Sequence, residues 1–174
     1  MTLHRKNPRL SAKNYFGRQS YFITICCDRR TQYLAAAPFA LHVVQIFLEC
    51  AAKHSFLAHA YCVMPDHIHF LAEGTCADSD LREFVRLFKQ RTAFAFRKRR
   101  GLPLWEMSYY EHILRPADAV EEVATYIWWN PVRKNLCPTP QEFPFSGSQT
   151  IDWMNRALLG TRWSAPWKAK KRPL

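Results

Sequence analysis

The most informative part of the chain covers residues 61–71 and reads YCVMPDHIHFL. Its apolar runs on either side of Pro65 and Asp66 predict two strands that form a hairpin through this turn. Because side chains alternate between the two faces of a strand, His67 and His69 would point the same way just after the turn. Two such imidazoles could hold one metal ion, although a strand histidine is more often an ordinary half-exposed polar residue.

The rest of the chain alternates between strand-like and helix-like patterns. Short β-branched and aromatic runs indicate strands, and apolar residues three and four apart indicate helices. Asp78 or Ser79 would cap the second helix, and Gly101, Pro103 and Pro131 interrupt the pattern. The order β-α-β-β-α-β-α predicts an α+β fold, a mostly antiparallel central sheet with helices packed on it, close to the ferredoxin-like split motif. The predicted elements are strands at residues 21–27, 57–64, 67–73 and 104–114 and helices at residues 39–54, about 80–99 and 117–129.

Length and composition predict a single domain over residues 1–174, because 174 residues with 48% hydrophobic content can bury an ordinary core. A basic arm, residues 1–19, would precede it, and a basic tail would follow from about residue 150. No apolar run of about 18 residues or signal-peptide core is present, so we expect a soluble, cytoplasmic protein with no membrane partner. The six cysteines form no Cys-x-x-Cys pair and are expected to be reduced thiols.

The charge balance favours a polyanionic partner. The chain carries 25 Lys and Arg against 14 Asp and Glu, a net charge of +11, which makes nucleic acid the leading candidate. Aromatic side chains such as Trp105 could stack on unpaired bases, although core packing is the ordinary use of each. The candidate DNA-binding residues are Arg5, Lys6, Arg9, Arg82, Arg86, Lys89, Arg97, Lys98, Arg99, Arg100 and the C-terminal lysines for phosphate, with Tyr109 and Tyr110 for bases.

A second polar pair lies on the last predicted helix. Tyr126 and Asn130 are four residues apart, so they are neighbours on one helical surface and could face the same cleft. The alternative for Tyr126 is packing beside the tryptophans that follow it. The alternative for Asn130 is a cap, since a residue before Pro131 is pushed out of the helical conformation. The residues alone leave both alternatives open.

Three ordered phrases resemble the REP-associated tyrosine transposases, relatives of the single-tyrosine HUH transposases of small insertion sequences. They are VMPDHIHFL at residues 63–71, YIWWNPVR at 126–133 and FPFS at 143–146, and the resemblance covers about residues 15–150. It implies that His67 and His69 bind a metal, that Tyr126 is the nucleophile and that Asn130 is the third metal ligand. Asp66 would be an extra ligand, an orienting partner or simply a turn residue.

The resemblance also implies the reaction. Such proteins cut single-stranded DNA near a hairpin, leave a 5′-phosphotyrosine link and a free 3′-hydroxyl, and can rejoin strands by reversing the step. A divalent ion, Mg or Mn, would offset the charge of the phosphate, and phenolate is a good enough leaving group for the reverse step. Tyr109 and Tyr110 are rival nucleophiles, but they lack a ligand-like amide one turn away.

Two other functions stay open. A catalytically inert nucleic-acid-binding protein of the same fold would keep the basic surface and form no covalent adduct. An unrelated zinc hydrolase using His67, His69 and His112 would cut without a covalent intermediate. For the transposase that the resemblance implies, the expected partner is a single-stranded DNA hairpin. The chain could act as a monomer or a homodimer.

Overall fold

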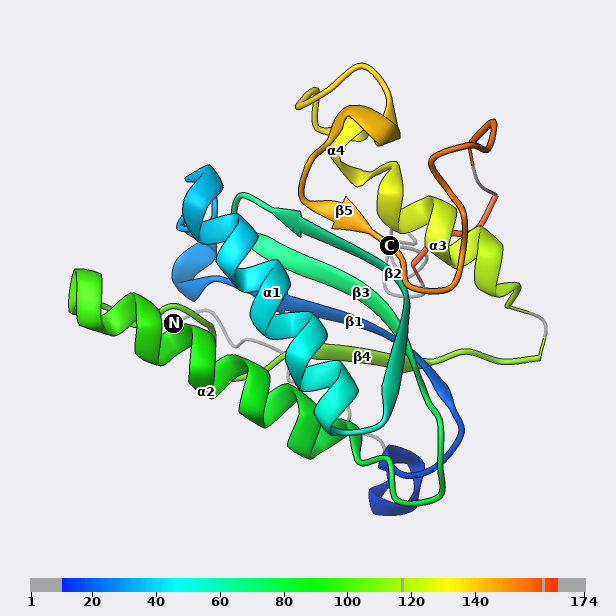
Figure 1. The fold of residues 1–174 in the computed structure, drawn as a ribbon, viewed down its shortest axis with the longest axis horizontal. Helices are drawn as coiled ribbons and strands as arrows, with labels where there is room; N and C mark the ends of the chain where they lie inside the picture. Colours follow the sequence, from blue (N-terminus) through cyan, green and yellow to red (C-terminus); the bar gives the residue numbers. More distant parts are fainter. Residues whose placement is uncertain (1–10, 117, 161, 166–174) are drawn as a thin grey trace, which may run out of the picture.

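The computed structural model describes residues 11–116, 118–160 and 162–165, and its fold is α+β, as predicted. Five strands form one antiparallel sheet in the order β4-β1-β3-β2-β5 (Figure 1). The elements are η1 (Ala12–Tyr15), β1 (Ser20–Cys26), η2 (Asp28–Arg30), α1 (Ala37–Lys53), β2 (Phe56–Met64), β3 (His67–Gly74), α2 (Leu81–Arg100), β4 (Tyr110–Ile113), α3 (Val120–Trp128), α4 (Asn130–Arg133), η3 (Pro140–Glu142) and β5 (Ser146–Gly147).

The predicted hairpin forms the centre of this sheet. Strands β2 and β3 pair through the turn at Pro65 and Asp66, and β3 pairs on its other side with β1. In this register His69 lies opposite Thr24 of β1 and Cys62 of β2. The histidines therefore stand on the middle strand, whose backbone is held by a ladder on each side.

Helices cover the two faces of the sheet unequally. Helices α1 and α2 contact each other and pack on one face (Figure 1), where Phe47 meets Phe70, Phe84 and Phe88 at ring-centroid separations of 4.9–6.0 Å. Helix α3 packs on β2 and β3 from the opposite face, over a smaller apolar cluster that includes Phe22. That second face carries the histidines. Among the described residues, no helix combines the length and apolar character needed to cross a membrane.

The start of α2 differs from the prediction. Asp80, not Asp78 or Ser79, is the cap, and its carboxylate accepts a hydrogen bond from the backbone N–H of Arg82 at 2.8 Å. Ser79 is buried and instead closes the preceding loop, because its hydroxyl donates to the carbonyl of Ser55 at 2.8 Å. The helix ends at Gly101, whose φ of 70° is the left-handed conformation that glycine adopts without strain.

The second half of the chain is more irregular than predicted. The fourth strand is shorter than the predicted residues 104–114, because β4 covers only Tyr110–Ile113. Trp105 joins the sheet through an isolated bridge to Cys27, and its indole N–H donates to Thr92. The last helix divides into α3 and α4 around Trp129 and Asn130, just before Pro131. The short edge strand β5 was not predicted.

Candidate active site

The two predicted metal ligands face each other from the central strand. The Nε2 atoms of His67 and His69 are 3.0 Å apart, and the rings stand nearly perpendicular with centroids 4.5 Å apart. Both side chains are buried. The sheet thus fixes two nitrogen donors toward a common point on the face covered by α3.

A carboxylate orients the first imidazole. Nδ1 of His67 lies 2.5 Å from Oδ1 of Asp66, whose Oδ2 pairs with Nε of Arg30 at 3.0 Å. Burial alone would raise the pKa of the Asp66 carboxyl, but the hydrogen bond with His67 and the charges of His67 and Arg30 outweigh it and lower the pKa. The ionised carboxylate accepts from Nδ1, which leaves the Nε2 lone pair of His67 directed at the site. Asp66 is therefore an orienting partner.

A hydroxyl supports the second imidazole. Nδ1 of His69 lies 2.7 Å from Oγ1 of Thr24, the residue directly opposite on β1.

At His67, desolvation lowers the pKa, and the charges of Arg30 and Lys134 act in the same direction against the raising effect of Asp66. His67 is consequently neutral near pH 7, the form in which an imidazole binds a metal.

The donor set fits a divalent ion. Two nitrogens at right angles, each about 2.1 Å from one ion, would be about 3.0 Å apart, and the Nε2 atoms are separated by 3.0 Å. Within residues 11–116, 118–160 and 162–165, no three His, Cys, Asp or Glu side chains form a metal-holding group. An ion here would need an amide, water or phosphate oxygen as a further ligand. His112, the third ligand of the zinc-hydrolase alternative, pairs instead with Asp118 at 3.3 Å.

The predicted nucleophile lies beside this pair. Helix α3 places the ring of Tyr126 edge-on to His69, with ring centroids 6.5 Å apart. The ring centroid also lies 6.0 Å from that of Phe22, and Tyr126 is only 5% exposed. The chain therefore brings together a phenol from residue 126 and imidazoles from mid-chain, which is the convergence that the resemblance implies.

An aromatic cover closes over the phenol. Trp163, in the segment after β5, packs edge-on against Tyr126 with ring centroids 4.8 Å apart. It also packs at a tilt against Phe22 with centroids 5.3 Å apart. Its indole N–H donates to Asp118 at 3.3 Å, and its backbone N–H donates to Glu122 at 3.4 Å. The C-terminal segment thus lies over the candidate nucleophile.

Asn130 lies one turn beyond Tyr126 and has a capping role. Its Nδ2 donates to the carbonyls of Tyr126 at 3.0 Å and Ile127 at 3.2 Å. Pro131 has no N–H to offer to Ile127, four residues before it, so the side-chain amide replaces that donor. This arrangement fixes the amide nitrogen and leaves the carbonyl oxygen as the atom that could serve a metal.

Sequence reasoning did not single out Arg133. Its guanidinium lies over the Tyr126 ring, with Cζ 4.4 Å from the ring centroid, and Nη2 donates to the Tyr126 carbonyl at 2.6 Å. The signal is present in the sequence, because Arg133 is seven residues after Tyr126 and three after Asn130, spacings that share a helical face. Thr24 carried no such signal, since strand register cannot be read from one strand.

The rival tyrosines lie at the start of β4 and just before it. Tyr110 of β4 pairs with Thr24 and so belongs to the same face and the same cross-strand row as His69, two strands away. Burial raises the pKa of Tyr110 most, and the charge of Glu111 raises it further. Tyr109 packs against the core on the other face. The ring of Tyr126, in contrast, lies edge-on to His69, a predicted metal ligand.

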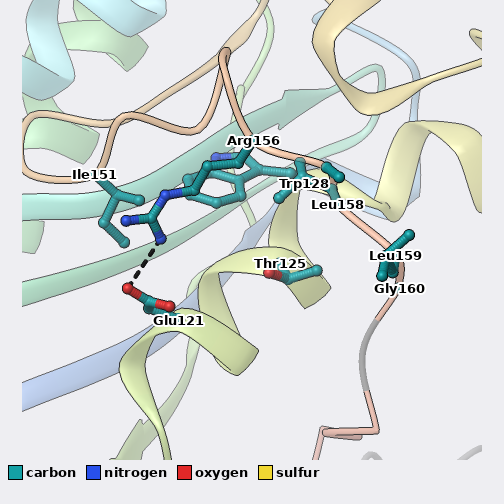
Figure 2. Close-up of a pocket in the computed structure, with 9 residues that line it drawn as sticks. Glu121, Thr125, Trp128, Ile151, Arg156, Leu158, Leu159 and Gly160 are labelled. Carbon is teal, nitrogen blue, oxygen red and sulfur yellow. Dashed lines mark hydrogen bonds and ion pairs between the residues drawn. The ribbon is translucent and has the colours of Figure 1, made fainter.

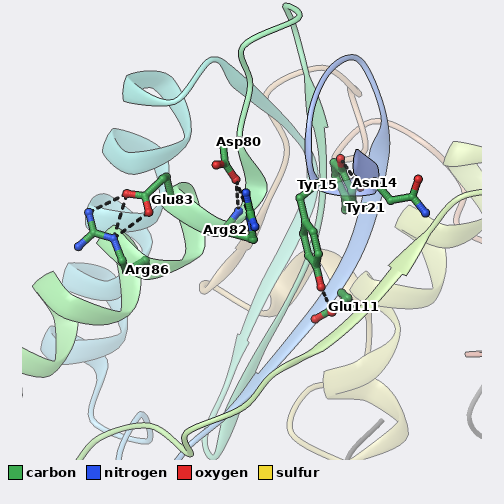
Figure 3. A network of polar contacts seen from close by, with 8 residues as sticks. All are labelled: Asn14, Tyr15, Tyr21, Asp80, Arg82, Glu83, Arg86 and Glu111. Carbon is green, nitrogen blue, oxygen red and sulfur yellow. Dashed lines mark hydrogen bonds and ion pairs between the residues drawn. The ribbon is translucent and has the colours of Figure 1, made fainter. Parts of the chain in front are cut away.

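Several predicted DNA-binding cations already have protein partners. Arg86 is paired with Glu83 at 2.7 Å, and Arg82 lies 3.5 Å from Asp80 (Figure 3). Lys89 donates to the carbonyls of residues 106 and 107 at 2.7 and 2.9 Å. The run at residues 97–100 forms the exposed last turn of α2. Arg5, Lys6, Arg9 and the C-terminal lysines lie outside the described residues.

A cavity of about 210 Å³ lies between the outer side of α3 and the C-terminal segment (Figure 2). Its lining includes Thr125 and Trp128, and Arg156 pairs with Glu121 at 2.9 Å beside it. None of the residues that line it belongs to the histidine pair or is Tyr126. The cavity therefore belongs to the packing of the C-terminal segment and not to the candidate site.

Comparison with known proteins agrees with the resemblance read from the sequence. The family described as "Transposase IS200 like" matches residues 16–129, about two thirds of the chain. The REP-associated tyrosine transposase of Escherichia coli (strain K12) is 23% identical over 148 residues, 80% of this chain and 87% of the relative. The solved structure of a REP-associated tyrosine transposase bound to a REP hairpin shares the fold, with a TM-score of 0.64, 23% identity and coverage of 95% of this chain and 100% of that one. The chain belongs to the IS200-like transposase family.

Proposed function

We propose that this transposase nicks single-stranded DNA at REP-like hairpins and rejoins strands through a 5′-phosphotyrosine at Tyr126. The observation that supports this most directly is the packing of the Tyr126 ring against His69, whose Nε2 faces that of His67 at 3.0 Å. The proposed nucleophile and the proposed metal-binding pair are thereby close together although about 60 residues separate them in sequence. The E. coli relative and the hairpin-bound structure support the choice of REP-like hairpins.

The chemistry follows from the side chains. The Tyr126 hydroxyl attacks the phosphorus, its proton passes to solvent, and a new bond forms between the phenolic oxygen and phosphorus. The bond to the 3′ oxygen breaks, and that oxygen takes up a proton to give a free 3′-hydroxyl. In the reverse direction a 3′-hydroxyl attacks and the phenolate of Tyr126 leaves. No external energy source is required, because the covalent link conserves the phosphodiester bond energy.

The proposed metal site consists of His67, His69 and the amide oxygen of Asn130. Mg or Mn bound there would polarise the phosphate oxygens and help to hold the phosphate in line with the phenol. The oxygen donors favour these hard ions over zinc. Asp66 and Thr24 keep the two imidazoles in the orientation that presents both Nε2 atoms.

The experiment is a search for a covalent adduct. The protein is incubated with labelled single-stranded REP-like hairpins and Mn or Mg, and the product is run on a denaturing gel. We expect a denaturant-resistant protein–DNA band that needs the metal. It should disappear in Tyr126→Phe, although that variant should still bind the hairpin, and it should persist in Tyr110→Phe, the matched control from the same face of the sheet.

Other outcomes would redirect the assignment. An adduct that survives in Tyr126→Phe would assign the nucleophile to Tyr109 or Tyr110. Unchanged cleavage by His67→Ala would exclude the proposed metal site. Tight hairpin binding by the unaltered protein without any adduct, with both metals, would support the inert nucleic-acid-binding alternative.

A further inference from the structure

A stripe of three polar side chains runs along the end of α3 and into α4. Tyr126, Asn130 and Arg133 are spaced by four and three residues, and the helical hydrogen bond from the N–H of Arg133 to the carbonyl of Trp129 carries the same helical face across the division at Trp129. The first two members have roles in the proposed function. The third has none so far.

The Arg133 guanidinium is held next to the nucleophile. Nη2 donates to the Tyr126 carbonyl at 2.6 Å, and Cζ lies 4.4 Å from the centroid of the Tyr126 ring. A guanidinium has five N–H donors in a rigid plane, so the bond to the carbonyl uses only a part of its capacity. The guanidinium therefore lies over the ring of the proposed nucleophile.

Within the described part of the chain, no acid balances the charge of Arg133. Among the ion pairs of the described residues, none joins Arg133 to a carboxylate. The side chain is exposed, and partial desolvation lowers its pKa, opposed by the nearby Tyr126 and Cys62. An exposed guanidinium without an acidic partner among the described residues is available to an anion, and its planar fork matches the oxygens of a phosphate.

Other cations lie around the same site. The charges of Arg30 and Lys134 both act on His67, and the carboxylate that contacts His67, Asp66, is already bound to both His67 and Arg30. The local field therefore favours an anion beside the imidazole pair and the phenol.

We propose that Arg133 binds a non-bridging oxygen of the scissile phosphate and holds it against Tyr126. This inference rests on the proposed function. Arg133 would be a catalytic residue, because its guanidinium would touch the reacting group, neutralise charge on the phosphate and limit its rotation. The alternative is that Arg133 only caps the Tyr126 carbonyl. The two roles differ in whether the contribution of Arg133 to binding depends on the charge of the scissile phosphate.

The test is a binding cycle in the non-cleaving Tyr126→Phe background. The DNA is a hairpin oligonucleotide whose cleaved linkage has been mapped with the unaltered protein, and a second oligonucleotide carries an uncharged methylphosphonate at that one linkage. Affinities are measured by fluorescence anisotropy for the background protein and for the same protein with Arg133→Gln, whose amide can still cap the carbonyl. Melting temperatures establish that each variant is folded.

A phosphate contact predicts unequal effects. Arg133→Gln should weaken binding of the natural oligonucleotide about tenfold or more, since hydrogen bonds to charged groups are the strong ones. It should weaken binding of the methylphosphonate oligonucleotide less than about twofold by the same reasoning. Arg133→Lys, which keeps the charge but not the planar fork, should lie between these values on the natural DNA.

Two results would overturn the inference alone. Equal weakening on both oligonucleotides would assign Arg133 to a structural cap, and no weakening on either would remove it from the site. Failure of the proposed function gives a different result, because the unaltered protein would then form no adduct with any hairpin. That result would remove both proposals together.

Discussion

At the scale of single residues, Asp66 connects the charge of Arg30 to the imidazole of His67. We predict that Asp66→Asn lowers the affinity for Mn²⁺ about 10–100-fold, the usual effect of removing a partner that orients a metal ligand. Calorimetric titration with Mn²⁺ measures this. Asp78→Asn, an exposed position in the loop before α2, should leave the affinity unchanged, and an equal loss in both variants would contradict the role given to Asp66.

The protonation of His67 gives a pH prediction. Its pKa is lowered, chiefly by desolvation, so the imidazole stays neutral to a lower pH than an exposed histidine with a pKa of about 6.5. Since only the neutral ring binds a metal, Mn²⁺ affinity should hold at about pH 6.5 and decline as the pH falls further. Titrations at several pH values, with the His67 ring protons followed by NMR, test this. A decline beginning above pH 7 would contradict it.

The residues of the site could be predicted only where a short motif carries them. His67 and His69 share a strand and Tyr126 and Asn130 share a helix, so local spacing suffices to group each pair. Which partner each imidazole has depends on tertiary contacts. Thr24 reaches His69 through strand register, and register is set by the assembled sheet.

At the scale of elements, the start of α2 depends on Asp80. We predict that Asp80→Ala lowers the free energy of unfolding by about 1 kcal/mol, because the backbone N–H of Arg82 loses its acceptor. Urea denaturation measures the change. Asp78→Ala is the matched control and should have little effect, whereas the reverse ranking would restore the cap predicted from the sequence.

Long periodic elements were predictable, and short ones were not. The hairpin of β2 and β3 and helices α1 and α2 agree with the patterns that indicated them. Strand β5 has only two residues, Ser146 and Gly147, so it has no periodicity to detect. Its position depends on close packing, because a Cβ on Gly147 would lie 2.2 Å from the hydroxyl oxygen of Tyr61.

At the scale of the whole molecule, positive charge is unevenly available for DNA. The last turn of α2, residues 97–100, is exposed, whereas Arg86 is paired with Glu83. We predict that glutamine at all four positions flattens the salt dependence of hairpin binding, by up to about 0.7–0.9 in logarithmic slope for each phosphate that the protein no longer neutralises. Arg86→Gln is the control and should leave the slope nearly unchanged. Equal slopes for all three proteins would exclude the end of α2 from the interface.

In the proposed reaction, the C-terminal segment would be a barrier between DNA and the phenol. Trp163 packs on both Tyr126 and Phe22, and each such aromatic contact contributes about 0.5–1.5 kcal/mol. We predict that Trp163→Ala raises the initial rate of adduct formation, up to about a hundredfold, since the two contacts together contribute about 1–3 kcal/mol and each 1.4 kcal/mol is a factor of ten. Leu159→Ala, at an exposed position in the same segment, should not. A slower rate in Trp163→Ala would mean that the indole supports the site instead of covering it.

The sheet keeps its larger core on the face opposite the histidines, under α1 and α2. The larger core and the candidate site therefore lie on opposite faces of one sheet. The segment that follows β5 packs on the histidine face and adds Trp153 and Ala165 to the smaller cluster. A change in this segment therefore alters the cover of the candidate site while the hairpin beneath it stays anchored from the other side.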